Sequence, residues 1–470
     1  MKLSQLFLGA ALLASASAWA QAPKYIFLYI GDGMGMGPVN TAQTYNRTIL
    51  RADKPLTMMQ MPVVGWCTTY SASADITDSA AAGTALSTGY KTKNGMLGQN
   101  PDSVAVESMA LKLKRMGYGV GIATTVAADD ATPGAFYAHV PNRKHYTTIV
   151  HQLAASDYEF VAGAGLKGFA DKDKGDALRE AVVKSGRQIV RGPEGIKQID
   201  ADKVLLLNTE GTVDYNVGYT IDSVAGVLTP AMIADACIQH LERTSPDKFF
   251  MMFEGGNIDH ALHANDGGAA IKEVLAFDQA LAYAYDFYLA HPDETLIVVT
   301  ADHDTGGLAQ VHAKLPGGGL ANIDLQKVSK EEFSSYCKAI LKSRRIFTWD
   351  DMKEYLSDNL GFFSHIRLSD DQEERLRELF DDTFELRNTA DQETLYANFN
   401  AFAVEVFRLF NDASGLAFTT LSHSGNPVPV FAVGVGADAF KGYNTNTDIP
   451  AAILQISRGA IHCARPNCTH

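Results

Sequence analysis

Five short apolar segments of the chain end abruptly in turns rich in glycine and polar residues. They are KYIFLYIGDGMG, GYGVGIATTVAADDATP, KFFMMFEGGNIDH, ETLIVVTADHDTGG and PVPVFAVGVG. Runs that are apolar on both faces are typical of central strands in a sheet covered by helices. Helical patterns lie between them, over residues 105–117 and 273–290. This alternation predicts an α/β fold with a doubly wound, mostly parallel sheet flanked by helices.

The strand pattern is interrupted between about residues 308 and 420. A glycine-rich stretch, LPGGGLAN, is followed there by charged amphipathic patterns that are typical of helices. Thr348 and Asp351 have the spacing of a capping box, and Ser369 precedes an acidic first turn. We therefore expect a helical insertion that caps the sheet, within a single domain over residues 21–470.

Acidic side chains outnumber basic ones in this chain of 470 residues. The 54 Asp and Glu against 40 Lys and Arg give a formal net charge of −14. No run of Lys or Arg is long enough to follow a phosphate backbone, which argues against nucleic acid as a partner. An anionic substrate would need local positive charge from metal ions or from a placed arginine.

The first 20 residues have the pattern of a cleaved signal peptide. Lys2 precedes an apolar run that ends in Ala18-Trp19-Ala20, the small-x-small pattern of a signal peptidase site. This run is too short to span a bilayer comfortably, and no later stretch approaches the ~18–20 apolar residues of a membrane helix. We expect a periplasmic or secreted protein with no membrane anchor.

Five cysteines are too few for a disulfide framework in a chain of this length. Cys67 and Cys237 have apolar neighbours, and we expect them to be buried as thiols. Cys463 and Cys468 are close enough in sequence to close a small loop in an oxidising compartment.

Residues that can carry chemistry follow the predicted strands where each strand ends. They are Asp32, Thr132, Glu254, Asp259, Asp302 and His303. Ligands of open α/β sheets bind beyond the carboxyl ends of the strands. Each residue alone is better explained as a turn former, a solvated acid or a core histidine. Four carboxylates at one edge, however, would repel one another and be costly to desolvate unless cations lie between them.

One predicted ligand set contains nitrogen and oxygen atoms. Asp259, His263 and His423 suit zinc with an open coordination position. Asp259 and His263 are four residues apart and share one face if a helix begins there. His260 would point about 100° away and is a poorer ligand for the same ion.

Two further ligand sets share one carboxylate. Asp302 and His303, with Asp32 as a bridge, form a second zinc-type set. Asp32, Glu254 and the hydroxyl of Thr132 form an all-oxygen set that suits magnesium. Two such ions roughly 3.5–4 Å apart would hold both oxygens of an in-line displacement.

A candidate nucleophile and a candidate anion clamp lie elsewhere in the chain. Ser79 should begin a helix that stops at Gly89, where backbone N–H groups favour an anion or an alkoxide. Ser79 alone would be better explained as a helix cap, because capping serines greatly outnumber nucleophiles. Arg143 offers a planar fork for two phosphoryl oxygens.

Taken together, these candidate residues resemble those of the alkaline phosphatase family. The motifs that carry the resemblance occur in order over most of the chain: GDGMG with Asp32, DSA with Ser79, DDATP with Asp130 and Thr132, NRK with Arg143, EGGNIDHALH with Glu254, Asp259 and His263, TADHDTGG with Asp302 and His303, and SHSG with His423. The resemblance implies an exported phosphomonoesterase, usually a homodimer, with two zinc ions and one magnesium ion. It also implies that the serine is phosphorylated and then freed by a zinc-bound hydroxide.

Carried over to this chain, the resemblance gives each residue a role. Ser79 would attack phosphorus while Arg143 holds the non-bridging oxygens. The ion at Asp259, His263 and His423 would stabilise the leaving alkoxide. Asp130 and His260, two positions that vary within the family, would contact phosphate or magnesium from the next layer of residues.

Other functions remain open on the sequence. A phosphodiesterase of the same metalloenzyme superfamily would share the two-metal core and is the main alternative. A sulfatase would need a Cys/Ser-x-Pro-x-Arg motif, which the residues after Ser79 lack. The signal peptide disfavours a cytosolic phosphoglycerate mutase. A non-catalytic phosphate-binding or metal-storage protein would not need the serine.

Overall fold

The computed structural model describes residues 22–211, 215–315, 317–343, 346–387 and 391–459. The predicted signal peptide, residues 1–20, lies outside the described residues, and so do Cys463 and Cys468. Cys67 and Cys237 are buried free thiols, as predicted. Across the described ranges, no helix is both long and apolar enough to cross a membrane.

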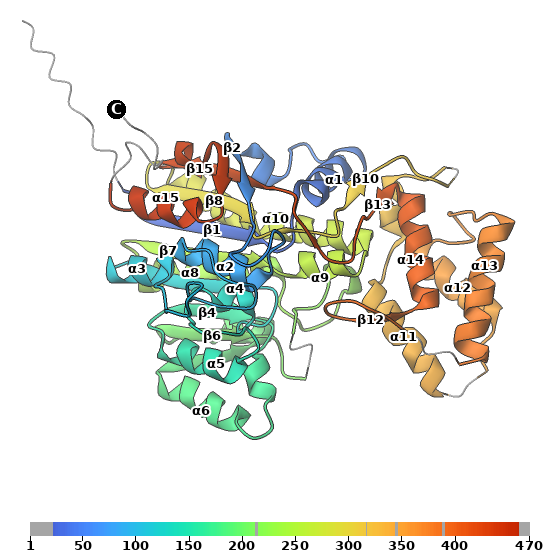
Figure 1. The fold of residues 1–470 in the computed structure, drawn as a ribbon, viewed down its shortest axis with the longest axis horizontal. Helices are drawn as coiled ribbons and strands as arrows, with labels where there is room; N and C mark the ends of the chain where they lie inside the picture. The colour runs from blue at the N-terminus through green and yellow to red at the C-terminus, as the bar shows by residue number, and fades with distance from the viewer. Residues whose placement is uncertain (1–21, 212–214, 316, 344–345, 388–390, 460–470) are drawn as a thin grey trace, which may run out of the picture.

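Within the described residues, ten strands form one large sheet through the centre of the molecule (Figure 1). From one edge to the other they are β16 (Gly442–Thr445), β2 (Val63–Thr68), β15 (Val428–Gly434), β8 (Thr295–Ala301), β1 (Tyr25–Gly31), β7 (Phe249–Gly255), β3 (Gly119–Thr124), β4 (Phe160–Gly163), β6 (Lys203–Leu207) and β5 (Arg187–Arg191). β15 is antiparallel to both of its neighbours, and every other pairing in this sheet is parallel. The predicted mostly parallel sheet is confirmed.

Helices cover both faces of the sheet, because its central strands are apolar on both sides. The helices outside the insertion are α1 (Met36–Thr48), α2 (Ser79–Thr88), α3 (Met109–Arg115), α4 (Ala131–Gly134), α5 (Tyr146–Ala155), α6 (Gly175–Lys184), α7 (Gly192–Ile196), α8 (Pro230–Thr244), α9 (Asn257–His263), α10 (Gly267–Ala290) and α15 (Asp448–Ile456). α10 packs against α1 and α8, and α15 packs against α2 and α3.

The helical segment between β8 and β15 has an apolar core of its own. It contains α11 (Lys330–Ser343), α12 (Trp349–Leu360), α13 (Asp370–Phe380) and α14 (Ala401–Ser414). Its core includes Phe333, Trp349 and Phe402 and is separate from the core of the sheet. Capping boxes begin α12 at Thr348 and α13 at Ser369, where Gln372 completes the box. The segment lies beyond α9 at one end of the molecule, and not over a face of the sheet (Figure 1).

Short antiparallel pairs join this helical segment to the rest of the fold. β10 (Ala309–Gln310) pairs with β13 (Leu416–Ala417), so the chain leaves and returns side by side. β9 (Asp304–Thr305) pairs with β14 (His423–Ser424), which brings His423 next to the end of β8. A hairpin of β11 (Asp391–Glu393) and β12 (Asn398–Asn400) leads into α14.

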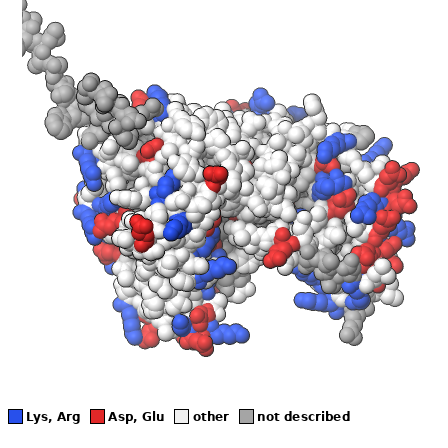
Figure 2. All heavy atoms as spheres, in the orientation of Figure 1, with Lys and Arg blue, Asp and Glu red and all other residues white. Residues whose placement is uncertain are grey.

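Charged side chains of both signs are interspersed on the face drawn in Figure 2. They gather most densely over the helical segment, where α13 begins with the acidic residues Asp370, Asp371 and Glu373. This face therefore presents no broad basic surface.

Candidate active site

Three neighbouring strands, β8, β1 and β7, end side by side, and residues of the candidate site lie at these ends. β1 lies between β8 and β7, with Gly31 opposite Ala301 and Gly255. The next residues along β1 and β8 are Asp32 and Asp302, so the register sets these two carboxyl groups side by side. Glu254 lies opposite Ile30 at the end of β7. The predicted convergence at strand ends therefore follows from parallel pairing alone.

Asp32, Asp302 and His303 form the first compact group. The Nε2 atom of His303 lies 3.4 Å from Oδ1 of Asp32 and 3.2 Å from Oδ2 of Asp302. All three side chains are buried, and their ligand atoms are close enough to hold one ion. Burial, with the neighbouring carboxyl group of Asp302 next in importance, raises the pKa of Asp32 well above its ordinary value.

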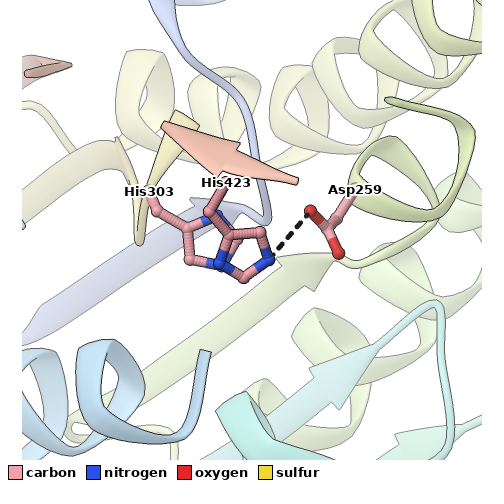
Figure 3. A group of neighbouring side chains, drawn as sticks. All are labelled: Asp259, His303 and His423. Atoms are coloured by element: carbon pink, nitrogen blue, oxygen red, sulfur yellow. Dashed lines mark ion pairs between the residues drawn. The ribbon is translucent and has the colours of Figure 1, made fainter. Parts of the chain in front are cut away.

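Asp259, His263 and His423 form the second group. The i, i+4 spacing on α9 places His263 Nε2 3.4 Å from Oδ2 of Asp259. His423 Nε2 lies 3.0 Å from His263 Nε2. It also lies 3.9 Å from Oδ1 of Asp259, the ion pair drawn in Figure 3. His423 also stacks on His303 with ring centroids 3.6 Å apart, so the two groups adjoin.

The tautomers of these histidines favour a cation. His263 Nδ1 lies 2.6 Å from the carbonyl oxygen of Leu421, and His423 Nδ1 lies 2.8 Å from that of Thr77. Each Nδ1–H therefore donates to the backbone, and when both rings are neutral the facing Nε2 atoms carry lone pairs. Two such lone pairs repel unless a cation accepts both, and a carbonyl behind each ring is the usual support of a metal-binding histidine.

Glu254 lies between Thr132 and Asp32, the other members of the third predicted group. Its carboxylate accepts a hydrogen bond from the Thr124 hydroxyl and also faces the side chains of Thr132 and Asp32. Burial raises the pKa of Glu254 to about 7. Thr132 is brought in by the short helix α4, which follows β3.

Unsatisfied oxygen atoms provide an independent test of the metal assignment. Asp32 Oδ1, Thr132 Oγ1 and Asp302 Oδ2 belong to the buried polar atoms of the described residues that lack a hydrogen bond of good geometry, and these three meet at the candidate site. Burial, reinforced by the carboxylate of Asp259, raises the pKa of Asp302 to about 8. Such orphaned acceptors need either protons or cations. The donor set therefore fits divalent metal ions.

Ser79 lies at the start of α2 and against the first group. Its Oγ is 3.2 Å from Nε2 of His303. Asp78 is the cap of this helix, because its carboxylate accepts a hydrogen bond of 2.9 Å from the N–H of Ala81. The capping role that could have explained Ser79 is therefore filled by its neighbour. Gly89 ends the helix with φ of 81°, as predicted.

Arg143 is held at the site by acidic residues on two sides. One guanidinium nitrogen lies 3.0 Å from Oδ1 of Asp130, and the other lies 3.7 Å from Oδ2 of Asp78. Lys167, in the 3-10 helix η2 (Lys167–Ala170), binds the other oxygen of Asp130 at 2.5 Å. Burial alone would raise the pKa of Asp130, but Lys167 and Arg143 together hold it far below its ordinary value. No motif of the sequence points to Lys167, which was not predicted.

A second residue that was not predicted, Tyr396, comes from the helical segment. Tyr396, in the hairpin between β11 and β12, donates a hydrogen bond of 3.0 Å to Oδ2 of Asp259. Its ring contacts that of His260 in a tilted arrangement, with centroids 3.8 Å apart and 33° between the ring planes. Burial lowers the pKa of His260 to about 4, so this ring is neutral. His260 thus packs against Tyr396, consistent with its predicted direction away from the Asp259 and His263 group.

Comparison with known proteins identifies the reaction class. The family model described as alkaline phosphatase matches residues 23–458. Alkaline phosphatase 4 of Bacillus subtilis (strain 168) is 27% identical over 447 residues, which cover 92% of this chain and 88% of that protein. The crystal structure of a cold-active alkaline phosphatase from a psychrophilic Shewanella sp. is similar, with a TM-score of 0.77 and 26% identity over 92% of this chain and 99% of that one.

A further solved structure carries a metal ion. It is a His 135 Glu mutant of the alkaline phosphatase from the bacterium TAB5 with Mg bound in the M3 site, with a TM-score of 0.65 and 25% identity. That match covers 93% of this chain and 99% of the other. Because the family model spans nearly the whole chain and the fold agrees, this phosphomonoester-hydrolysing enzyme belongs to the alkaline phosphatase family.

Proposed function

We propose that the enzyme hydrolyses phosphate monoesters at alkaline pH through a phosphoserine intermediate on Ser79, assisted by two zinc ions and one magnesium ion. The observation that carries this proposal is the position of the Ser79 hydroxyl. It lies 3.2 Å from His303 Nε2, next to a buried group of acids and histidines. A phosphate-binding or metal-storage protein would not need a hydroxyl there.

The reaction has two displacement steps at phosphorus. Ser79 Oγ, having lost its proton, forms a bond to phosphorus as the bond to the alcohol oxygen breaks, and the alcohol leaves with a proton. Water then attacks the phosphoserine, which releases inorganic phosphate and returns the proton to Ser79. Arg143 would hold two non-bridging oxygens with its guanidinium, while Asp130 fixes the orientation of that guanidinium.

The metal ions supply Lewis-acid chemistry, which lowers the pKa of the serine hydroxyl and of water and neutralises charge at phosphorus. Asp259, His263 and His423 would hold one zinc ion, and Asp32, Asp302 and His303 the other. Asp32, Thr132 and Glu254 would hold magnesium. Arg143 contributes a fixed positive charge that does not depend on the ions.

Paired substrates test this proposal against a phosphodiesterase. We expect p-nitrophenyl phosphate to be hydrolysed much faster than bis(p-nitrophenyl) phosphate at alkaline pH. A chelator should abolish the activity, and zinc with magnesium should restore it. Preferential hydrolysis of the diester would contradict the monoesterase proposal, and full activity after verified metal removal would contradict the role of the ions.

We also propose that the protein is exported and that it forms a homodimer. The pattern of residues 1–20 supports export with cleavage after Ala20, and the family resemblance supports a homodimer. N-terminal sequencing of protein from the periplasm or the culture medium should begin at Gln21. Light scattering of that mature protein should give the mass of two chains.

A further inference from the structure

A surface cleft opens beside the second candidate metal group. It reaches His263 and His423 and is lined by residues from five separate stretches of the chain, among them Ile76, Asn94, Leu395 and Leu421. Two of these belong to the loops next to Ser79 and next to His423, and Leu395 belongs to the hairpin of the helical segment. The cleft therefore joins the candidate active site to the insertion.

Hydrogen bonds at its tip and its base hold the hairpin that forms one wall of the cleft. At its tip, the N–H and hydroxyl of Thr394 both donate to the carbonyl oxygen of Ala397, at 2.8 Å and 2.7 Å. At its base, Lys338 Nζ donates to the carbonyl oxygen of Asn398 at 3.0 Å. Tyr396, next to Leu395, donates a hydrogen bond to Asp259 and packs against the ring of His260. These contacts hold Leu395 over the mouth of the site.

The opposite wall contains Ile76 and Asn94 and is hydrogen-bonded to the segment that leads to Ser79. Asn94 Nδ2 donates to the carbonyl oxygen of Ile76 at 3.1 Å, and its Oδ1 accepts from the N–H of Asp78 at 3.3 Å. Ile76 is thus fixed three residues before Ser79. The side chains of Ile76 and Leu395 are 40% and 58% exposed, so both present apolar surface to whatever enters the cleft.

The geometry of the proposed displacement indicates which part of the substrate would lie in this cleft. In an in-line displacement the leaving oxygen lies opposite the attacking oxygen. Ser79 lies against His303, whereas the cleft opens at His263 and His423 in the adjoining group. The alcohol half of the ester would therefore extend into the cleft while its phosphoryl group is held by Arg143.

We propose that the walls of this cleft at Ile76 and Leu395 make the enzyme select monoesters of uncharged aromatic or other apolar alcohols. This inference rests on the proposed function, because that function defines which side of phosphorus the alcohol leaves from. The lining contains the carboxylate of Glu393 and no lysine or arginine among its described residues. The cleft should consequently disfavour alcohols that carry a second negative charge.

Phosphonates that are not hydrolysed test the cleft by binding alone. Calorimetry on the metal-loaded full-length enzyme would compare phenylphosphonate with methylphosphonate, which share the anionic group and differ in the apolar part. We expect phenylphosphonate to bind more tightly, and Leu395→Ala to reduce that advantage about three- to tenfold. Leu289→Ala is the matched control, because Leu289 is 59% exposed at the end of α10 and does not line the cleft.

A second variant tests the charge preference. Glu393→Gln should strengthen binding of 4-carboxyphenylphosphonate about two- to fivefold relative to phenylphosphonate, since it removes a negative charge from the wall. The inference is overturned if phenylphosphonate has no advantage in the wild type, or if Leu395→Ala and Leu289→Ala leave the same ratio. Hydrolysis of p-nitrophenyl phosphate, measured in parallel, reports on the proposed function independently of these binding ratios.

Discussion

In the candidate site, Arg143 and Lys167 both bind the carboxylate of Asp130. Asp130 binds Arg143 through one oxygen and Lys167 through the other. The trio carries a net positive charge, which favours a dianionic phosphoryl group in an otherwise acidic protein. It also holds the guanidinium in one orientation, so that little entropy is lost when phosphate binds.

Replacement of Arg143 should affect phosphate binding more than turnover. Arg143→Ala removes two charge-assisted hydrogen bonds to phosphate, so competitive inhibition by inorganic phosphate should weaken about 10- to 100-fold. We expect turnover at saturating substrate to fall by less than this factor. Arg115→Ala, at an exposed arginine of α3, should match the wild type. Unchanged phosphate inhibition in Arg143→Ala would rule out the clamp.

Lys167 should act through Asp130 as a positioning residue. Lys167→Gln removes one of the two cations that bind Asp130 and leaves Arg143, and we expect KM and the inhibition constant of phosphate to rise about three- to tenfold. Lys167→Arg should restore most of the loss, because it returns the charge beside Asp130. If both variants lose affinity equally, or if both only lower the melting temperature, Lys167 has a packing role instead.

At the scale of elements, α2 begins at the proposed nucleophile Ser79 and ends in a turn at Gly89. Gly89 ends this helix in the left-handed region, and an added Cβ would meet nothing closer than 3.6 Å. Gly89→Ala should therefore lose roughly 1–2 kcal/mol of unfolding free energy through backbone conformation alone. Gly89→Asn should lose less, since asparagine tolerates this conformation. Chemical unfolding of both variants would measure this, and equal losses would point to a steric cause.

Strands were predictable where burial on both faces leaves a continuous apolar run. β1, β3, β7, β8 and β15 are of this kind and were all found from the sequence. β2 was not, because its side chains alternate between buried and exposed next to the edge strand β16. β4, β5 and β6 are only four or five residues long, too short for a periodic signal to stand out.

At the scale of the whole molecule, buried acids outside the candidate metal site make stability depend on pH. Burial raises the pKa of Glu273 from its ordinary value of 4.5 to about 7. The folded state thus binds a proton that the unfolded state releases, so this group's stabilisation is lost as pH rises from about 4.5 to above 7. Asp222 and Glu331 have raised pKa values of about 6 and 7 for the same primary reason.

Glu273→Gln isolates one of these groups. Glutamine can still accept the hydrogen bond from the N–H of Thr220, which Glu273 accepts at 2.6 Å, but it does not titrate. Between pH 5 and pH 8 the variant should therefore lose about 1–3 kcal/mol less unfolding free energy than the parent. Glu107→Gln, at an exposed position, should follow the parent. Parallel pH profiles for all three proteins would contradict the assignment.

The candidate site could be predicted to the extent that it is built from strand ends. Parallel pairing brings the residues after β1, β7 and β8 together whatever lies between them in the sequence. Lys167 and Tyr396 could not be found in this way, because each reaches the site from a connecting turn or hairpin with no periodic pattern. Their positions depend on tertiary packing, in one case on the separate core of the helical segment.

Trapping of the covalent intermediate tests the central claim most directly. The metal-loaded enzyme would be mixed with p-nitrophenyl phosphate, quenched in acid and digested, and its peptides analysed by mass spectrometry. We predict one phosphoryl group on Ser79 in the wild type, and no label with loss of most turnover in Ser79→Ala. Wild-type turnover in Ser79→Ala, or a phosphoryl group on another residue, would contradict the phosphoserine mechanism.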